Sequence, residues 1–262
     1  MPAAVTAIDG LLLDMDGVLT VSWDPIPGAV AAFRKLREGG LRLQVVSNTS
    51  SRSRSAIAGR LREAGFRIAD SEVLTAAVAA AAYLRARHAG AAVAMIGDAQ
   101  PEDLEGVRLV DLDEAPDVVL VAGADESFTF ERLNRVFRVL VGGAALVGMH
   151  RNLEWMTTEG PCLDSGAYLL GLERALGREA VIAGKPAAEC FAAGLDLLGL
   201  PAGRVAMVGD DVDNDVLAAQ AVGITGVLVR TGKYREDMVA RAQGRPDHVV
   251  DSIADVPALL GL

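Results

Sequence analysis

The sequence predicts an α/β protein that has a parallel sheet at its core and a second, smaller α/β domain inserted into the chain. Near both ends of the chain, short apolar runs alternate with segments of helical periodicity, which is typical of buried parallel strands joined by helices. Between these parts, residues 78–182 contain strand and helix patterns of their own, enough to bury a separate core. We therefore expect one domain from residues 1–77 and 183–262 and an inserted domain from residues 78–182.

The N-terminal elements are predicted in the order strand, helix, strand, helix. Residues 7–14 are short and largely apolar, as in a buried strand. Residues 28–40 (GAVAAFRKLREGG) place apolar side chains at helical spacing and end in two glycines, which stop a helix. The same signals predict a strand at residues 41–48 (LRLQVVSN) and a helix at residues 53–65 (SRSAIAGRLREAG). This order favours a parallel sheet with helices on both faces.

The rest of the chain repeats this alternation. In the inserted part, the sequence predicts an alanine-rich helix at 75–84, strands at 92–98, 117–123 and 144–150, and a helix at 127–143. In the C-terminal part, it predicts helices at 187–200 and 215–223, strands at 204–210 and 225–230, and a short strand followed by a helix within 247–262.

Charge and cysteine content narrow the classes of function. The chain has 25 Lys and Arg against 35 Asp and Glu, a net charge of −10 that repels nucleic-acid phosphates, so we expect no nucleic-acid partner. Two cysteines are too few for a disulfide framework or a structural zinc site, so we expect reduced thiols and a cytoplasmic protein. The N-terminal apolar run lacks a basic flank and contains Asp9, which argues against a signal peptide, and no segment is apolar enough to span a membrane.

Polar side chains follow four predicted strand ends, the places where ligands bind in parallel α/β sheets. In chain order they are an acid pair (Asp14 and Asp16), a hydroxyl and an amide (Ser47 and Asn48), a lysine (Lys185) and an acid cluster (Asp210, Asp211, Asp213 and Asp215). Each group alone has an ordinary explanation, such as a solvated turn or a helix cap. Because we assign all four ends to the outer domain, we expect them to converge on one crevice and to act together.

These groups suit phosphoryl transfer assisted by Mg²⁺, an ion that prefers oxygen ligands. Asp14 and Asp210 would supply carboxylates to the metal, and one oxygen of Asp14 could attack phosphorus to form an aspartyl-phosphate. Asp16 could protonate the leaving oxygen and later deprotonate the hydrolytic water. The Ser47 hydroxyl and the Lys185 ammonium would hold phosphoryl oxygens. The sequence therefore predicts a phosphatase that acts on a small phosphorylated substrate.

The same residues resemble the four motifs of the haloacid dehalogenase superfamily of phosphohydrolases. The segments LLLDMDGVL, VVSN, GKP and VAMVGDDVDND carry the resemblance, in the order that the family has them. The resemblance implies a Rossmann-like parallel-sheet core that binds Mg²⁺. It implies that Asp14 is the nucleophile, that Asp16 is the general acid/base whose backbone carbonyl also binds the metal, and that Asp210 is a metal ligand.

The resemblance also assigns the remaining motif positions. Ser47 and Lys185 take the phosphate-binding positions of the second and third motifs, and Asn48 beside Ser47 is a further phosphate-binding candidate. A second acid of the fourth motif supports the metal shell in this family. Asp211 and Asp215 are both candidates for that position, and the spacing GDxxxxD favours Asp215.

The inserted domain lies between the second and third motifs, where the family carries its class II caps. A second α/β unit at this place resembles the class IIA cap of NagD-like members, and the segment VLVRTGKYR resembles the branch that contains the phospholysine, phosphohistidine and inorganic pyrophosphate phosphatases. The segment MHRNLEWMTTEGPCLDSGAY resembles the loop with which such caps face substrate; its candidate residues are His150, Arg151, Trp155 and Asp164. A packing or turn role for each of them is the alternative. The resemblance also implies a homodimer formed through the cap.

Two other functions are compatible with this fold. A haloacid dehalogenase uses the same first aspartate but needs no general acid at the position of Asp16, so Asp16 favours phosphate chemistry. A binding protein that has lost catalysis is expected to lack the nucleophile or a metal ligand, and the sequence has both. The sequence does not name the substrate, because the core motifs specify the phosphoryl group and not the leaving group.

Overall fold

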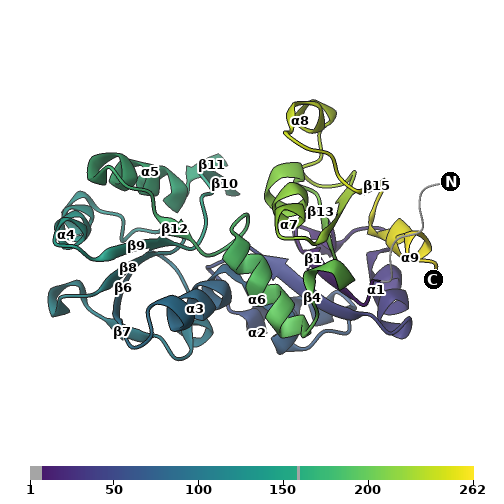
Figure 1. Cartoon of the computed structure of the whole chain (residues 1–262), viewed down its shortest axis with the longest axis horizontal. Helices are drawn as coiled ribbons and strands as arrows, with labels where there is room; N and C mark the ends of the chain where they lie inside the picture. The colour runs from purple at the N-terminus through teal and green to yellow at the C-terminus, as the bar shows by residue number, and fades with distance from the viewer. Residues whose placement is uncertain (1–7, 158–159) are drawn as a thin grey trace. The chain divides into compact units, whose positions relative to one another are not determined.

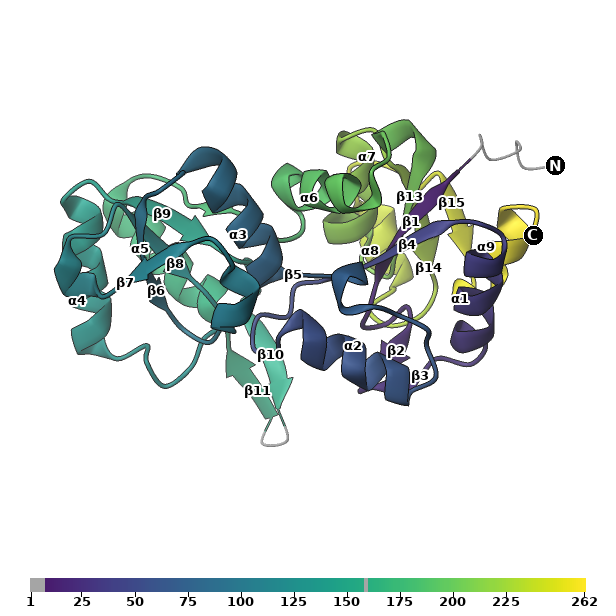
Figure 2. The same cartoon turned by 90° about the horizontal axis from the view of Figure 1, so that it is seen from below.

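The computed structural model describes residues 8–157 and 160–262, and it divides the chain into two compact units, whose elements are labelled in Figures 1 and 2. The core unit consists of Met1–Ser47, Arg54–Leu74 and Lys185–Leu262, and the inserted unit of Asn48–Ser53 and Thr75–Gly184. The main insertion thus runs from residue 75 to residue 184 rather than from 78 to 182, and the inserted unit also takes in residues 48–53. Ser50 shows why, because its Oγ accepts a hydrogen bond of 3.2 Å from the backbone N–H of Gly123 in the inserted unit.

The core unit is built on one six-stranded sheet. Its strand order is β15 (His248–Val250), β14 (Thr225–Val229), β13 (Val205–Gly209), β1 (Gly10–Asp14), β4 (Arg42–Ser47) and β5 (Val73–Thr75). Strand β1 lies between β13 and β4 and pairs with both in parallel (Figure 2). All five residues of β1 are buried, which agrees with the apolar character of the sequence and places the end of this strand at the middle of the sheet edge.

Helices and short turns connect these strands. The helices of the core unit are α1 (Ala29–Glu38), α2 (Arg54–Glu63), α6 (Ala188–Leu198), α7 (Ala218–Ala221), α8 (Glu236–Arg241) and α9 (Val256–Leu259). Between them lie a small hairpin of β2 (Thr20–Val21) and β3 (Asp24–Pro25), and the 3-10 turns η1 (Asp70–Glu72), η4 (Ala202–Arg204) and η6 (Ile253–Asp255). The helix predicted at residues 215–223 is replaced by a π-helical segment, η5 (Val212–Leu217), followed by α7.

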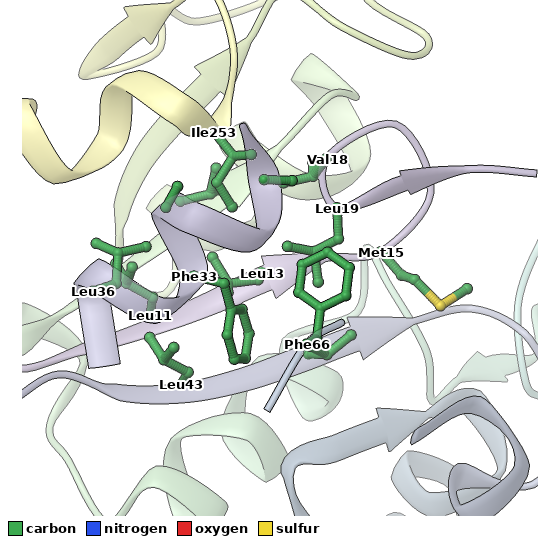
Figure 3. Packing of buried hydrophobic residues seen from close by; sticks show 14 of the residues in the cluster. Leu11, Leu13, Met15, Val18, Leu19, Phe33, Leu36, Leu43, Phe66 and Ile253 are labelled. Carbon is green, nitrogen blue, oxygen red and sulfur yellow. The ribbon is translucent and has the colours of Figure 1, made fainter. Parts of the chain in front are cut away.

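The two faces of β1 pack against different helices, because successive residues of a strand point to opposite sides. Leu11 belongs to the large apolar cluster of the core unit, together with Phe33 of α1 (Figure 3). Leu12 faces α6 instead, since a Cβ built on Gly194 of α6 would lie 2.9 Å from the Leu12 side chain. Asp14 has the same parity as Leu12, so its carboxylate emerges on the side of the sheet that carries α6.

The inserted unit has its own sheet, with the strands in the order β12 (Val181–Ile182), β9 (Ala145–Gly148), β8 (Val118–Val121), β6 (Ala92–Ile96) and β7 (Arg108–Val110). All of these pairs are parallel, and β10 (Glu154–Thr157) and β11 (Gly160–Leu163) form a separate antiparallel hairpin. The helices are α3 (Ala76–Arg87), α4 (Phe130–Val141) and α5 (Ser165–Leu176), with 3-10 turns η2 (Pro101–Leu104) and η3 (Leu112–Glu114). Strand β12 corrects one prediction: it pairs with β9 and is not a strand of the core sheet.

Within the described residues, no helix has the length and apolar character needed to cross a membrane. The prediction that the N-terminal apolar run is not a signal peptide concerns, in part, residues 1–7, and these lie outside the described residues.

The packing around α1 yields a test with a matched control. Leu36 of α1 is fully buried, whereas Leu197 of α6 is 46% exposed. We expect Leu36→Ala to lower the free energy of unfolding of the core unit by about 2–5 kcal/mol through cavity formation, and Leu197→Ala to change it by about 0.5 kcal/mol or less. Urea unfolding followed by the fluorescence of Trp23, in a Trp155→Phe background, measures both variants. Equal unfolding midpoints would contradict the packing in Figure 3.

Candidate active site

The carboxyl end of β1 positions Asp14 beside two neighbouring strand ends. Asp14 pairs in register with Val46 of β4, so Ser47 lies one residue beyond it on the neighbouring strand. On the other side, Leu13 pairs with Val208 of β13, which brings Asp210 to the same sheet edge. Three of the predicted positions therefore meet because parallel strands end at one edge.

Lys185 joins this edge through a buried ion-pair network. Its ammonium donates to Asp14 Oδ1 at 2.5 Å and lies 2.7 Å from Asp215 Oδ1, and all three side chains are buried. Burial alone would lower the pKa of Lys185, but the charges of Asp14 and Asp215 outweigh it and raise the pKa, so the lysine remains charged. A buried charge needs such partners, and the cluster therefore fixes the position of the Asp14 carboxylate.

Lys185 reaches the site by a different route from the one the sequence predicted. The sequence predicts it at the third of the four strand ends of the outer domain, but the strand before it, β12, belongs to the sheet of the inserted unit. Lys185 is the first residue of the core unit after the insertion and precedes α6. Because α6 covers the face of the sheet to which Asp14 points, a lysine at the start of this connection lies close to Asp14.

Three buried carboxylates meet at this edge. One oxygen each from Asp14, Asp210 and Asp215 can be chosen so that all lie within 4.8 Å of one another. Burial, the largest cause, raises the pKa of Asp14, and it raises the pKa of Asp210 and of Asp215 to about 6, with repulsion between the carboxylates adding to the effect. A single lysine cannot balance three ionised carboxylates, so the cluster favours a further cation.

The surroundings of Asp210 fit a divalent metal ion. Its Oδ2 accepts a hydrogen bond of 2.7 Å from the backbone N–H of Lys233, whereas its buried Oδ1 has no hydrogen-bond partner in the part of the chain that the structure describes. Gly17 and Gly232 have positive φ angles of 88° and 59°, and a Cβ on either would overlap the Asp210 carboxylate. An orphaned oxygen among clustered carboxylates is the donor set that Mg²⁺ or a similar hard cation takes.

The hydrogen bonds also distinguish Asp211 from Asp215, the two candidates for the second acid that would support the metal shell. Asp211 Oδ1 accepts from the backbone N–H groups of Asp213 (3.2 Å) and Asn214 (3.0 Å), and Oδ2 accepts from Asn214 Nδ2 (2.8 Å). Asp211 therefore caps the start of η5, while Asp215 belongs to the buried cluster. The spacing argument for Asp215 agrees with this placement.

Asp16 follows Asp14 by two residues but is not a member of the carboxylate trio. Asp16 is exposed, and partial desolvation raises the pKa of its carboxyl, against the lowering effect of the positive charges of Lys233 and Lys185. Ser47 is buried at the end of β4. Asn48 begins the short segment that belongs to the inserted unit.

Lys233 is a site residue that the sequence reasoning missed. It lies in the loop after β14, its N–H orients Asp210, and its positive charge lowers the pKa values of Asp14, Asp16 and Asp210. The nearby Thr231 hydroxyl donates to the carbonyl of Gly17. The signal was present in the sequence, because the segment RTGKYR follows a strand that neighbours β13, and the strand-end rule applies to it as well.

Two of the candidate residues of the inserted unit have structural partners within that unit. Arg151 donates to both oxygens of Glu173, at 2.8 and 2.7 Å. Asp164 caps α5, with its Oδ1 accepting from the N–H groups of Ser165 (2.7 Å) and Ala124 (3.1 Å). These contacts give both residues a structural role, the alternative that the sequence left open, and a substrate role for either stays a prediction.

His150 and Trp155 are the other two candidates. His150 is buried with Nδ1 3.9 Å from Asp164 Oδ2, and burial lowers the pKa of its imidazole against the opposing charge of Asp164, so the ring is neutral at pH 7. Trp155 lies in β10, but its side chain is outside the described residues. A substrate role for either residue stays a prediction.

A parallel sheet whose edge gathers clustered aspartates and a lysine defines a class of α/β hydrolases, and comparisons with known proteins agree. Family models match residues 11–111 (haloacid dehalogenase-like hydrolase) and 182–256 (HAD-hydrolase-like). The chain is 36% identical to the phospholysine phosphohistidine inorganic pyrophosphate phosphatase of Danio rerio, over 97% of this chain and 95% of that protein. It is 33% identical to the human haloacid dehalogenase-like hydrolase domain-containing protein 2, over 89% of this chain and 88% of that protein.

Solved structures show the same relationship. The p-nitrophenyl phosphatase from Archaeoglobus fulgidus superposes with a TM-score of 0.89 at 33% identity, over 97% of this chain and 99% of that one. NagD from Escherichia coli superposes with a TM-score of 0.87 at 26% identity, over 95% of this chain and 98% of that one. The chain belongs to the haloacid dehalogenase-like hydrolases, and within them it groups with phosphatases.

Asp210→Asn tests the metal site, with Asp213→Asn as a control because Asp213 is exposed and outside the carboxylate trio. In excess Mg²⁺, the wild type should gain about 2.7 kcal/mol of stability at a hundredfold excess over Kd. Asp213→Asn should gain as much stability from Mg²⁺ as the wild type does, and Asp210→Asn should gain little. Thermal unfolding with and without Mg²⁺ measures these shifts, and an equal gain in all three proteins would contradict the site.

In EDTA, where no metal is bound, we expect Asp210→Asn to be more stable than the wild type. Because burial raises the pKa of Asp210 to about 6, its ionised form destabilises the metal-free protein at pH 8, and Asp210→Asn should unfold at a higher temperature than the wild type there. The native state binds this proton more tightly than the unfolded state does, so the advantage of the variant should shrink as the pH falls from about 6 to about 4.

Proposed function

We propose that this protein is a Mg²⁺-dependent phosphatase that hydrolyses a small phosphorylated metabolite through an aspartyl-phosphate on Asp14. The observation that carries the proposal is the buried network in which Lys185 contacts Asp14 at 2.5 Å and Asp215 at 2.7 Å, beside the orphaned oxygen of Asp210. The phosphatases among its relatives support the class of reaction.

Asp14 is suited to attack phosphorus because one of its oxygens is held and the other is the candidate nucleophile. Lys185 donates to Oδ1, which fixes the plane of the carboxylate. In the first step a bond forms between the second carboxylate oxygen and phosphorus, the bond from phosphorus to the leaving oxygen breaks, and Asp16 donates a proton to that oxygen. In the second step, water attacks phosphorus while Asp16 takes a proton from it. The bond between phosphorus and the Asp14 oxygen breaks, and inorganic phosphate is released.

The nucleophile must be ionised although burial raises its pKa. Lys185 favours the ionised form by its charge, and so does Lys233 more weakly. Mg²⁺ bound by Asp14, Asp210 and the backbone carbonyl of Asp16, with Asp215 in support, would supply the additional positive charge and polarise the phosphoryl group.

Ser47 and Asn48 complete the proposed phosphate site with Lys185. A hydroxyl and an amide at the end of β4 can donate to phosphoryl oxygens whose charge grows in the transition state, which is the interaction that accelerates the chemical step. A dehalogenase remains the alternative chemistry, and Asp16 argues against it because carbon–halogen cleavage needs no proton donor for the leaving group.

Several finer expectations belong with this proposal. The inserted unit would act as a class IIA cap, with His150 and Trp155 as candidate substrate contacts, and two copies would pair through it. The relatives that carry the names phospholysine phosphohistidine inorganic pyrophosphate phosphatase support a phosphoramidate, an anhydride or an ester as the substrate bond. The two free cysteines, Cys162 and Cys190, suit a reducing compartment such as the cytoplasm.

Asp14→Asn is the decisive substitution. It keeps the size and planarity of the side chain but removes the nucleophilic carboxylate, so we expect turnover of p-nitrophenyl phosphate with Mg²⁺ to fall by at least about a thousandfold. Asp213→Asn, matched in chemistry but exposed, should keep wild-type turnover. If Asp14→Asn retains near wild-type activity while its unfolding profile is normal, the aspartyl-phosphate mechanism is wrong.

Asp16→Asn separates proton transfer from nucleophilic attack. We expect kcat/KM for an alkyl phosphate to fall by about 10²–10⁴, because an alkoxide leaves poorly without a proton. The loss for p-nitrophenyl phosphate should be much smaller, since p-nitrophenolate leaves unprotonated. Steady-state kinetics with both esters gives the two ratios, and an identical loss for both would rule out Asp16 as the general acid.

A further inference from the structure

A cavity of about 370 Å³ opens in the core unit beside the carboxylate cluster. Asp210 lies in one wall, and the opposite wall is formed by the loop after β14 and by α8. The volume falls in the range of small-molecule sites, roughly 300–1,000 Å³, and exceeds what a metal ion and one phosphate need. Asp210 is the member of the carboxylate cluster that lines this cavity, and the cavity has room for the body of a small organic molecule beside the cluster.

Two positively charged side chains line this cavity and are available to bind a ligand. Lys233 and Arg235 both line it and are exposed, and neither side chain makes an ion pair or hydrogen bond with another of the described residues. The backbone of Lys233 is fixed by its hydrogen bond to Asp210, so its ammonium starts from a defined place next to the cluster. Its positive charge opposes the rise in the pKa of Asp14 and of Asp16, in keeping with a position near these carboxylates.

The acids of the cavity are already engaged. Asp211 accepts three hydrogen bonds from the start of η5, two from backbone N–H groups and one from Asn214 Nδ2. Asp210 is held by Lys233 N–H and belongs to the metal cluster. Both carboxylates keep their negative charge, and Lys233 and Arg235 are the charged groups of the lining whose side chains have no partner among the described residues.

The remaining lining is apolar and aromatic. Tyr234 packs against the small apolar cluster of Val212, Val216 and Leu228, and Met238 adds a flexible side chain from α8. An apolar body can be buried here while its charged end meets Lys233 and Arg235. This combination selects an organic anion rather than a neutral polar group such as a sugar.

We propose that this cavity is the leaving-group subsite and that it selects phosphate compounds whose leaving group has an apolar or aromatic body and a second negative charge. The proposal rests on the proposed function for the position of the phosphoryl group. Lys233 and Arg235 would bind the second anion, and Tyr234 and Met238 would contact the body. A carboxylate and a phosphate share this chemistry, and the test uses the carboxylate.

A matched pair of substrates tests the subsite. Phenyl phosphate and 4-carboxyphenyl phosphate differ in the leaving group by one carboxylate. We expect the wild type to prefer the carboxylated ester by at least about tenfold in kcat/KM, the size of one charge-assisted interaction. In Arg235→Gln and in Lys233→Met this preference should fall to about threefold or less. Arg241→Gln, an exposed α8 residue that pairs with Asp237 outside the cavity lining, should keep the full preference.

Binding of the leaving group alone gives a readout that does not require turnover. We expect 4-hydroxybenzoate to bind the Mg²⁺-loaded wild type at least about tenfold more tightly than phenol, and Arg235→Gln to lose the difference. A wild type that hydrolyses no phosphate ester but binds 4-hydroxybenzoate in this way would refute the proposed function and the leaving-group role together, and would show an organic-anion site only. A wild type that hydrolyses both esters equally, or a preference unchanged in both variants, would overturn the subsite.

Discussion

The buried contact of Lys185 with Asp14 and Asp215 is the interaction on which the site depends. It joins three segments that are far apart in the sequence: the end of β1, the start of η5 and the connection into α6. A charge buried without its partner costs about 3–5 kcal/mol, so each of these segments is held in place by the other two. The same contact that joins these segments also fixes the carboxylate of Asp14, the proposed nucleophile.

The buried network has more negative than positive charge, and this excess explains several features of the site. Three carboxylates share one buried lysine. Burial and then their mutual repulsion raise their pKa values, and an oxygen of Asp210 has no donor among the described residues. Close packing of the backbone at Gly17 and Gly232 keeps the space around that carboxylate narrow. The surplus of negative charge suits a metal ion, and Lys233 adds positive charge beside Asp210.

Two of the proposed site residues lie where the chain passes between the core unit and the inserted unit. The chain crosses between the core unit and the inserted unit four times, and two of these crossings lie between Ser47 and Asn48 and between Gly184 and Lys185. A proposed phosphate-binding hydroxyl and the buried lysine therefore stand directly at two of the boundaries. A rearrangement of either connection would act on groups that we propose to bind phosphate.

The sequence by itself determined the parallel core, the insertion and the identity of the main polar groups, because strand alternation and strand-end chemistry are local signals. Tertiary structure decided what these signals do not encode. The assignment of β12 to the second sheet depends on its pairing with β9, and the choice of Asp215 over Asp211 depends on which carboxylate caps η5 and which meets Lys185. Lys233 follows a strand that the sequence predicts, but its place beside Asp210 depends on the pairing of β14 with β13. The physical reason is common to all three: long-range pairing and burial decide which polar groups share one low-dielectric space, and local sequence cannot specify that.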